Sequence, residues 1–154
     1  MITEDKLTKG VMFGVPTLNR PVHPDWGLAA KSIGPPINYQ ANLMRVAGHE
    51  VAVARQGIAE PGVAAPCAFV FLLGDDVQAP GHTLTQLIYR MEQDPTLGVA
   101  GGIYCAKAEP TFPLVFRGNG RGSYWDWKVG EYFEVTGLGM DCTLIRTAVF
   151  DQLD

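Results

Sequence analysis

The sequence predicts an α/β domain with a mostly parallel central sheet, and three observations support this. Short apolar segments typical of strands alternate with segments of helical periodicity. The run Ala68–Leu73 is apolar throughout, which is typical of a central strand covered on both faces. Between Pro110 and Val135, short β-prone segments are separated by glycine-rich turns, so we expect a small β-hairpin insertion there.

In the first third of the chain, Val11–Val15 predicts a buried strand that Pro16 ends. The proline-rich segment that follows predicts a loop with one short helix near Gly27–Ser32. Tyr39–Val46 has a helical pattern of apolar residues, and Val51–Ala59 predicts a strand that leads into a short helix.

The next elements are more strongly patterned. Pro61, Gly62 and Pro66 predict a loop before the strand Ala68–Leu73. Thr83–Gln93 predicts an amphipathic helix, and Leu97–Tyr104 a short strand with a glycine break. Cys142–Ile145 predicts a last strand, and Ala148–Leu153 the start of a helix.

Composition limits the class of protein. The 154 residues suit one domain over 1–154, because no linker interrupts the pattern. A net charge of -4 without a basic cluster argues against a nucleic-acid partner. The apolar runs are too short to span a membrane and the N-terminus lacks signal-peptide order, so we expect a cytoplasmic protein. Three widely spaced cysteines predict free thiols.

Ligands of parallel α/β sheets bind at the carboxyl ends of the strands. Three segments follow predicted strands directly: Pro16-Thr17, Gly74-Asp75-Asp76 and Gly101-Gly102. We therefore expect these segments to lie near one another and to form the binding edge of the sheet.

The adjacent carboxylates Asp75 and Asp76 follow the most apolar strand without a gap. Two such groups repel each other, and a bound divalent cation would relieve that repulsion. Magnesium and manganese prefer oxygen ligands, typically one or two carboxylates together with substrate phosphates. A polar turn that caps a helix explains the same residues equally well.

Several segments in order resemble glycosyltransferase family 2, which has the GT-A fold. Ala54-Arg55-Gln56-Gly57 resembles the family's Ala-Arg-Asn-x-Gly segment, with Gln56 in place of asparagine. Phe69–Val77 with Pro80 resembles its apolar strand that ends in a DxD-type acidic motif. The resemblance covers most of the chain from Val11 and extends to these segments: Val15–Thr17, Gly101–Tyr104 and Gly137–Arg146.

The resemblance implies a metal-dependent glycosyltransferase that takes a sugar from a UDP- or GDP-linked donor and moves it to an unknown acceptor. In this family pattern Asp76 would hold Mn²⁺ or Mg²⁺, with Asp75 beside it facing the ribose or sugar. Arg55 would lie near the base or the diphosphate. The remaining residues of the implied nucleotide-sugar site are Pro16, Thr17, Gly101 and Gly102.

A transferase that inverts the sugar's configuration needs a general base. The family's later acidic motif and histidine are not found before Asp154, so we expect that the C-terminal part of the family fold is absent. The candidate bases are Asp126, Glu134 and Asp141. The alternative is a non-catalytic module of the same fold that binds nucleotide or sugar.

Two other enzyme classes rank lower. Phosphoryl-transfer enzymes of α/β type need a lysine and a hydroxyl residue after later strands, where this chain has Gly101-Gly102. Nucleotidyltransferases usually carry a glycine-rich basic loop after the first strand, and the segment from Pro16 to Arg20 is not one.

Four further features are open at this stage. His82 fits the start of a helix better than a metal ligand. Trp125-Asp126-Trp127 fits either a sugar-stacking platform or aromatic packing of the hairpin. Asp141 needs a partner, for which Arg146 and Arg121 are candidates. The hairpin could also support a homo-oligomer.

Overall fold

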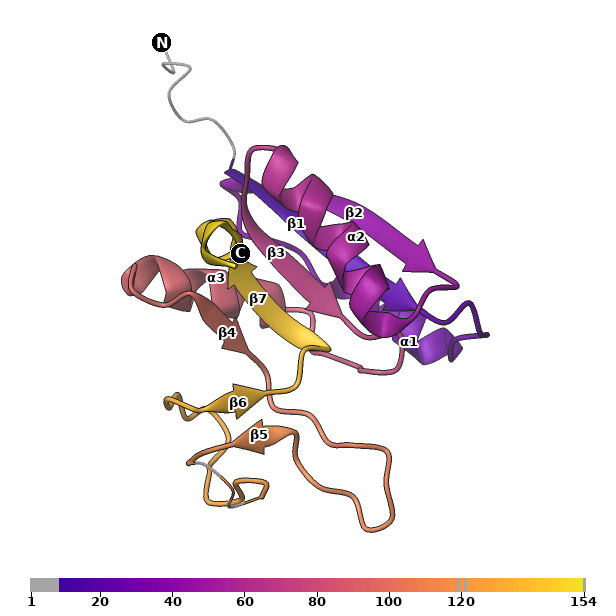
Figure 1. Cartoon of the computed structure of the whole chain (residues 1–154), viewed down its shortest axis with the longest axis vertical. Coiled ribbons are helices and arrows are strands. Elements are labelled where there is room, and N and C mark those ends of the chain that lie inside the picture. Colours follow the sequence, from indigo (N-terminus) through magenta and orange to yellow (C-terminus); the bar gives the residue numbers. More distant parts are fainter. Residues whose placement is uncertain (1–8, 119, 121, 154) are drawn as a thin grey trace.

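The central sheet has five strands in the order β2-β1-β3-β7-β4, as seen in a computed structural model that describes residues 9–118, 120 and 122–153 (Figure 1). The strands are β1 (Lys9–Thr17), β2 (Tyr39–Ala47), β3 (Cys67–Leu73), β4 (Val99–Gly101) and β7 (Cys142–Arg146). β1 pairs in parallel with β2 and β3, whereas β7 runs antiparallel to both β3 and β4. All strands except β7 therefore point the same way, which confirms the mostly parallel sheet.

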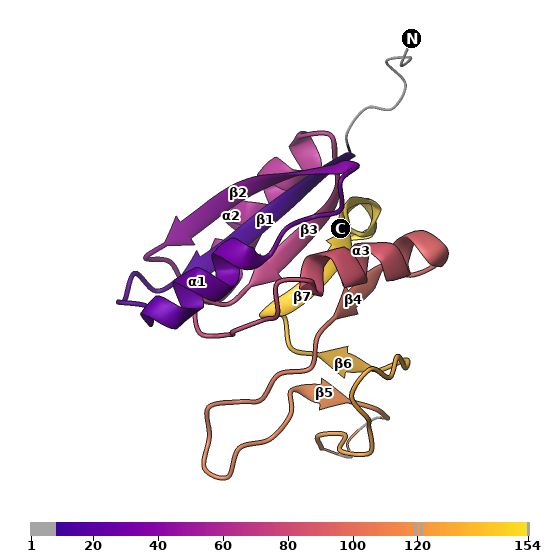
Figure 2. The same ribbon diagram turned by 180° about the vertical axis from the view of Figure 1, so that it is seen from behind.

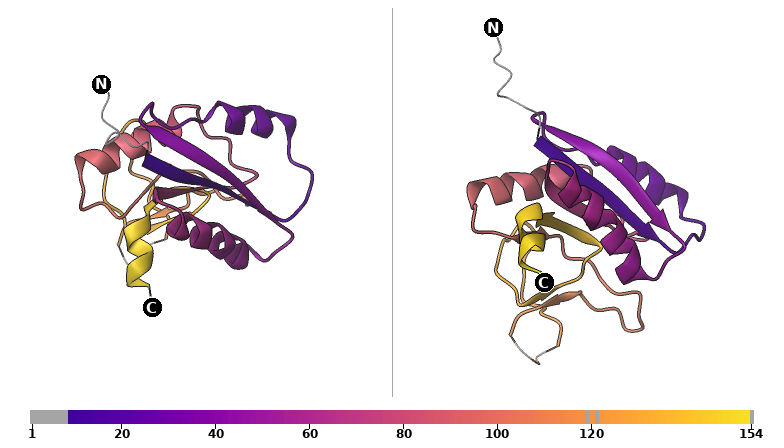
Figure 3. Two further views of the ribbon diagram at one scale, coloured as in Figure 1. Left: turned by 90° about the horizontal axis from the view of Figure 1, so that it is seen from above. Right: turned by 45° about the horizontal axis from the view of Figure 1, so that its top comes forward.

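Helices cover both faces of this sheet. The elements are α1 (Pro24–Ser32), α2 (Val51–Ala64), α3 (Thr83–Gln93) and the 3-10 helix η1 (Thr147–Gln152). α1 and α3 lie on one face, and α2 and η1 on the other (Figures 2 and 3). The result is a three-layer α/β/α sandwich.

β3 divides its side chains between two cores because successive residues of a strand point to opposite faces. Phe69, Phe71 and Leu73 belong to the core under α1 and α3, where Phe71 meets Phe13 edge to face with 5.0 Å between ring centroids. Val70 and Leu72 belong to the core under α2. The predicted burial of this strand on both faces is confirmed.

β1 continues through Pro16, so the expectation that Pro16 ends the strand is wrong. Odd-numbered residues of β1 bond to β2: the Lys9 N–H donates to the Asn38 carbonyl, and the Gly48 N–H donates to the Thr17 carbonyl. The missing N–H of Pro16 therefore falls on the β3 side, where pairing has already ended at Gly14. No ladder bond is lost, and the strand extends to Thr17.

The segment Tyr39–Ala47 is the strand β2 and not the predicted helix. The helical spacing of Leu43 and Val46 was misleading, because Leu43 is 75% exposed at the edge of the sheet. Tyr39 packs into the core under α3, and Met44 and Val46 pack on the α2 side. Side chains of β2 alternate between the two faces of the sheet, as in any strand. The sequence shows this alternation only in part, because many residues of an edge strand are exposed on both faces.

The segment from Val51 onward is the helix α2. The strand predicted at the start of Val51–Ala59 is therefore wrong, as is the loop at Pro61-Gly62, whereas the short helix predicted to follow that strand is part of α2. The Glu50 carboxylate accepts from the Ala52 N–H and caps the helix. The buried residues Ala54, Ile58 and Gly62 recur every four positions and form one stripe against the sheet.

The insertion forms a second sheet, in which β5 (Val115–Phe116) pairs antiparallel with β6 (Gly137–Leu138). It lies beyond the carboxyl end of β4 (Figure 1). The predicted glycine-rich turn includes Asn119 and Arg121, which lie outside the described residues.

The structure also bears on the expectations about the cysteines and about membrane-spanning segments. The three cysteines are free, with Cys67 and Cys142 buried and Cys105 exposed. In the part of the chain that the structure describes, no helix is both long and apolar enough to cross a membrane.

Gly14 and Gly27 offer a matched test of the packing between β1 and α2. A Cβ at Gly14 would lie 2.2 Å from Cγ2 of the fully buried Ile58, so we expect Gly14→Ala to destabilise the fold by roughly 1–3 kcal/mol. Gly27 lies in α1 with open space around it, so Gly27→Ala should stabilise by up to about 1 kcal/mol. Urea unfolding measures both, and an unchanged midpoint for Gly14→Ala would contradict the close contact.

Candidate functional site

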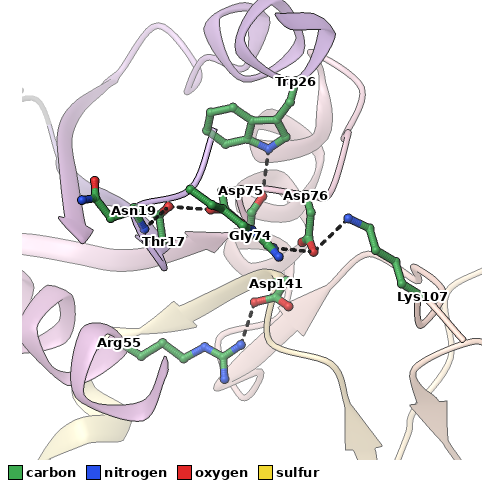
Figure 4. Close-up of polar contacts among 10 residues, drawn as sticks. Thr17, Asn19, Trp26, Arg55, Gly74, Asp75, Asp76, Lys107 and Asp141 are labelled. Carbon is green, nitrogen blue, oxygen red and sulfur yellow. Dashed lines mark hydrogen bonds and ion pairs between the residues drawn. The ribbon is translucent and has the colours of Figure 1, made fainter. Parts of the chain in front are cut away.

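The carboxyl ends of β1 and β3 place the predicted ligand-binding residues together. Thr17 is the last residue of β1, and Asp75 and Asp76 follow the last residue of β3 by two and three positions. Figure 4 shows Thr17, Asp75 and Asp76 close to Asp141, which directly precedes β7. The expected meeting of the β1 and β3 ends is therefore found.

Asp75 is the buried member of the carboxylate pair, with 8% of the residue exposed. Its Oδ2 accepts a short hydrogen bond from the hydroxyl of Thr17, which is itself buried. Its Oδ1 lies 3.2 Å from Nη2 of Arg20. The hydrogen bond to Asp75, helped by the charges of Asp75 and Asp76, raises the pKa of Arg20 above its ordinary value. Asp75 is thus fixed from two sides.

Asp76 is more open, and 29% of its side chain is exposed. Its Oδ2 lies 3.1 Å from Arg20 Nη2 and 3.1 Å from Lys107 Nζ. One guanidinium nitrogen therefore bridges both carboxylates, and a lysine from the segment after β4 adds a second positive charge. These cations relieve the repulsion between the two adjacent acids.

Asp141 is held by three contacts from different elements. Its Oδ1 lies 2.6 Å from Nη2 of Arg55 on α2. Its backbone N–H donates to the hydroxyl of Tyr104, and its carbonyl accepts from the Gly74 N–H at 2.9 Å. Burial raises the pKa of Tyr104 to about 12, so the phenol stays neutral as this acceptor.

Gly74 makes room for the acidic side chains on either side of it. A Cβ at this position would lie 2.7 Å from Cβ of Asp141 and 3.2 Å from Oδ1 of Asp76. The Gly74 carbonyl accepts from Nε1 of Trp26 at 2.8 Å, which ties α1 to the same point. Asp76 and Asp141 can approach each other only because residue 74 has no side chain.

The cluster balances three carboxylates against three cations. Asp75, Asp76 and Asp141 pair with Arg20, Arg55 and Lys107. Arg20 and Lys107 have side chains that are 51% and 72% exposed, so they can move away from Asp76 without disturbing the core. Arg55 is only 22% exposed and is the more fixed of the cations.

The donor set suits a hard divalent cation when phosphate oxygens complete it. Over residues 9–118, 120 and 122–153, no three His, Cys, Asp or Glu side chains are arranged as a metal site. Magnesium, however, commonly takes one or two carboxylates and fills its remaining positions with water and substrate phosphates. Asp76, whose side chain is 29% exposed, fits that role with its sequence neighbour Asp75.

The other predicted site residues make none of these ion pairs. Gly101 is in β4 and lines a cavity of about 780 Å³ between α3 and β6, together with Glu134. The Gly102 N–H donates to the Cys142 carbonyl, and Pro16 is buried in β1. Asp126 lines a separate hollow of about 770 Å³ in the insertion.

Sequence reasoning missed Arg20, Lys107 and Trp26 as members of the cluster. Arg20 follows β1 by three residues, and that position was a usable signal; Lys107 and Trp26 carried none. His82 opens α3, as expected.

The partner of Asp141 is Arg55. Arg146, one of the two predicted partners, instead donates to the carbonyls of Met91 and Leu97. Arg121, the other, lies outside the described residues.

A double-mutant cycle tests the contact between α2 and the start of β7. We expect Arg55→Gln and Asp141→Asn to show a coupling free energy of roughly 1–2 kcal/mol, because their charged hydrogen bond is largely shielded from water. The control pair Lys9 and Glu92 is more exposed and should couple by less than about 1 kcal/mol. Urea unfolding of each set gives the values, and equal coupling in both pairs would contradict the shielded contact.

Comparisons with known proteins bear on the fold alone. No protein-family model and no curated protein matches the chain. Among solved structures, A197 from STIV matches with a TM-score of 0.61 at 16% identity, covering 94% of this chain and 68% of that one. CMP:2-keto-3-deoxy-manno-octonic acid synthetase complexed with CTP matches with a TM-score of 0.56 at 12% identity, covering 95% and 78%. The chain is thus similar in its mixed α/β fold to both of these proteins.

Proposed function

We propose that the carboxyl edge of the sheet binds a nucleotide-diphosphate sugar with a divalent cation, and that the domain transfers the sugar to an acceptor. The observation that carries this proposal is the convergence of Thr17, Asp75 and Asp76 with the exposed cations of Arg20 and Lys107 at the ends of β1 and β3. Ligands of parallel α/β sheets bind at this edge. The synthetase of similar fold is complexed with CTP, which supports a nucleotide as the ligand class.

The ion pairs suit a ligand that brings both charges at once. A metal-diphosphate complex offers a cation to Asp75 and Asp76 and anionic oxygens to Arg20 and Lys107. Each internal pair would exchange for an equivalent pair with the ligand, so no charge would be left without a partner. A diphosphate alone, or a metal alone, would satisfy only half of these groups.

Sugar transfer breaks the bond between the anomeric carbon and a diphosphate oxygen, and the nucleoside diphosphate leaves with additional negative charge. A bound Mg²⁺ or Mn²⁺ supplies Lewis-acid stabilisation of that charge. Arg20 and Lys107 add positive charge on the same side. Thr17 keeps Asp75 in position through its hydroxyl.

The acceptor hydroxyl must also lose a proton to a base. Of the candidates, Asp141 belongs to the ion-pair cluster, whereas Asp126 and Glu134 line hollows beside the insertion. We therefore favour Asp141 as the base, with Arg55 as the residue that positions it.

A non-catalytic binding module is the second candidate, and one contact favours it. The carboxylate of Asp141 is engaged by Arg55 at 2.6 Å, and while this pair is closed its Oδ1 is not free to contact an acceptor hydroxyl. If the pair stays closed when the donor binds, the domain retains nucleotide or sugar without turning it over.

Calorimetry tests donor binding. We expect UDP, GDP or one of their sugars to bind more tightly with Mn²⁺ than without it, and CTP serves as a further nucleotide. Asp76→Asn should lower the metal-dependent affinity by at least about tenfold. Mutation of a residue that only orients a metal's direct ligand already lowers metal affinity by about 10–100-fold, and Asp76 is proposed as a direct ligand. Asp151→Asn removes the same charge from exposed η1 and should bind as the wild type does.

Two results would count against this proposal. Absence of metal-dependent binding to every nucleotide would reject the donor site, and equal binding by Asp76→Asn would reject the site assignment. Donor hydrolysis then separates the two candidates, because a binding module leaves the nucleotide sugar intact.

A further inference from the structure

Among the residues that the structure describes, the outer edge of β2 is a long strand edge without the usual protection. β2 is the terminal strand of the sheet and pairs with β1 along all nine of its residues. It contains no proline or lysine, and Arg45 is its one charged residue. Its pairing with β1 has no register shift, so no bulge turns the edge away. Proteins normally protect such an edge with charge, proline, bulges or a short strand.

The hydrogen bonds at the two ends of β2 show which backbone groups face outward. The Lys9 N–H donates to Asn38 and the Gly48 N–H donates to Thr17, so even-numbered residues of this segment face β1. In a strand the next residue faces the other way. The N–H and C=O groups of Ala41, Leu43 and Arg45 therefore point away from the sheet.

These outward groups match a second copy of themselves around a two-fold axis. If two β2 strands run antiparallel with Leu43 opposite Leu43, then Ala41 of each copy faces Arg45 of the other. In antiparallel sheets such facing residues exchange both of their backbone hydrogen bonds. All outward groups of Ala41, Leu43 and Arg45 are then satisfied. The Tyr39 N–H is already bonded to the Pro36 carbonyl, so the matched segment begins after it.

The side chains agree with this register. Leu43 is 75% exposed in the single chain and would lie on the axis, where each copy would cover the other's apolar side chain. Arg45 would lie opposite the small Ala41 and not opposite a second arginine, so no like charges face each other. A closed two-fold contact of this kind limits the assembly to two copies.

We propose that two copies of this chain associate through antiparallel pairing of β2 with β2, centred on Leu43, to form one continuous sheet across both. This surface differs from the hairpin insertion, and it does not depend on the proposed function. It also leaves the cluster around Asp76 open, because that cluster lies at the ends of β1 and β3 and not along the free edge of β2 (Figures 1 and 4).

Sedimentation equilibrium of the chain over a range of micromolar concentrations tests the proposal. We expect a monomer–dimer equilibrium in the wild type. Leu43→Lys should shift it to monomer, because two ammonium groups would meet at the axis. Leu28→Lys is the matched control: Leu28 is 70% exposed on α1, so this variant should dimerise as the wild type does.

A second variant tests the backbone pairing itself. Leu43→Pro removes an N–H that faces outward and leaves the bonds to β1 in place, so it should give a folded monomer. Circular dichroism checks the fold, and if this variant unfolds, Leu43→Lys decides alone. A wild type that stays monomeric throughout would overturn the proposal, as would a Leu43→Lys variant that dimerises as strongly as Leu28→Lys.

Discussion

The hydrogen bond from the Gly74 N–H to the Asp141 carbonyl joins the two acidic segments on which the candidate site depends. It continues the antiparallel pairing of β3 with β7 by one step past Leu73 and Cys142. Because β7 runs opposite to β3, its first residues lie where β3 ends, and Asp141 comes to lie beside Asp76. The absence of a side chain at Gly74 keeps the two carboxylates close. A parallel strand in the place of β7 would bring its last residues to this edge instead.

The cluster that results is balanced without any ligand, and this balance explains how three acids can lie together. The degree of exposure separates their roles. Asp75 is buried and held by Thr17, and Asp141 is held by Arg55. Asp76 is partly exposed and pairs with two exposed cations. A ligand that carries both a cation and anionic oxygens can replace the outer pairs while the inner ones stay in place. If the proposed donor binds here, Arg20 and Lys107 would move while the sheet stays unchanged.

The elements that could be predicted from the sequence are those whose apolar residues form a clear pattern within the element itself. β3, α3 and β7 lie within the core and show continuous or periodic burial, so Ala68–Leu73, Thr83–Gln93 and Cys142–Ile145 were predicted closely. β2 was missed because many residues of this edge strand are exposed, which hides the alternation of apolar and polar residues. Most of α2 was missed because Pro61 and Gly62 interrupt the helical pattern of its sequence. The acidic pair was found because it directly follows a buried strand. Its partners Arg20 and Lys107 were not found, since they come from segments without regular structure. Arg55 was predicted as a site residue, but its pairing with Asp141 depends on the tertiary fold.

The central proposal, that a metal-bound nucleotide binds at Asp75 and Asp76, is tested most directly by paramagnetic relaxation. In a ¹⁵N-labelled sample with UDP or GDP, substoichiometric Mn²⁺ should broaden the amide signals of Gly74, Asp75 and Asp76 first, followed by those near Thr17 and Asp141. Signals at the amino-terminal end of β2 and in the insertion should stay sharp, because relaxation by the ion falls steeply with distance. The carboxyl end of β2 pairs with Thr17 and should broaden with it. Broadening centred elsewhere, or the same broadening pattern in Asp76→Asn, would contradict the account.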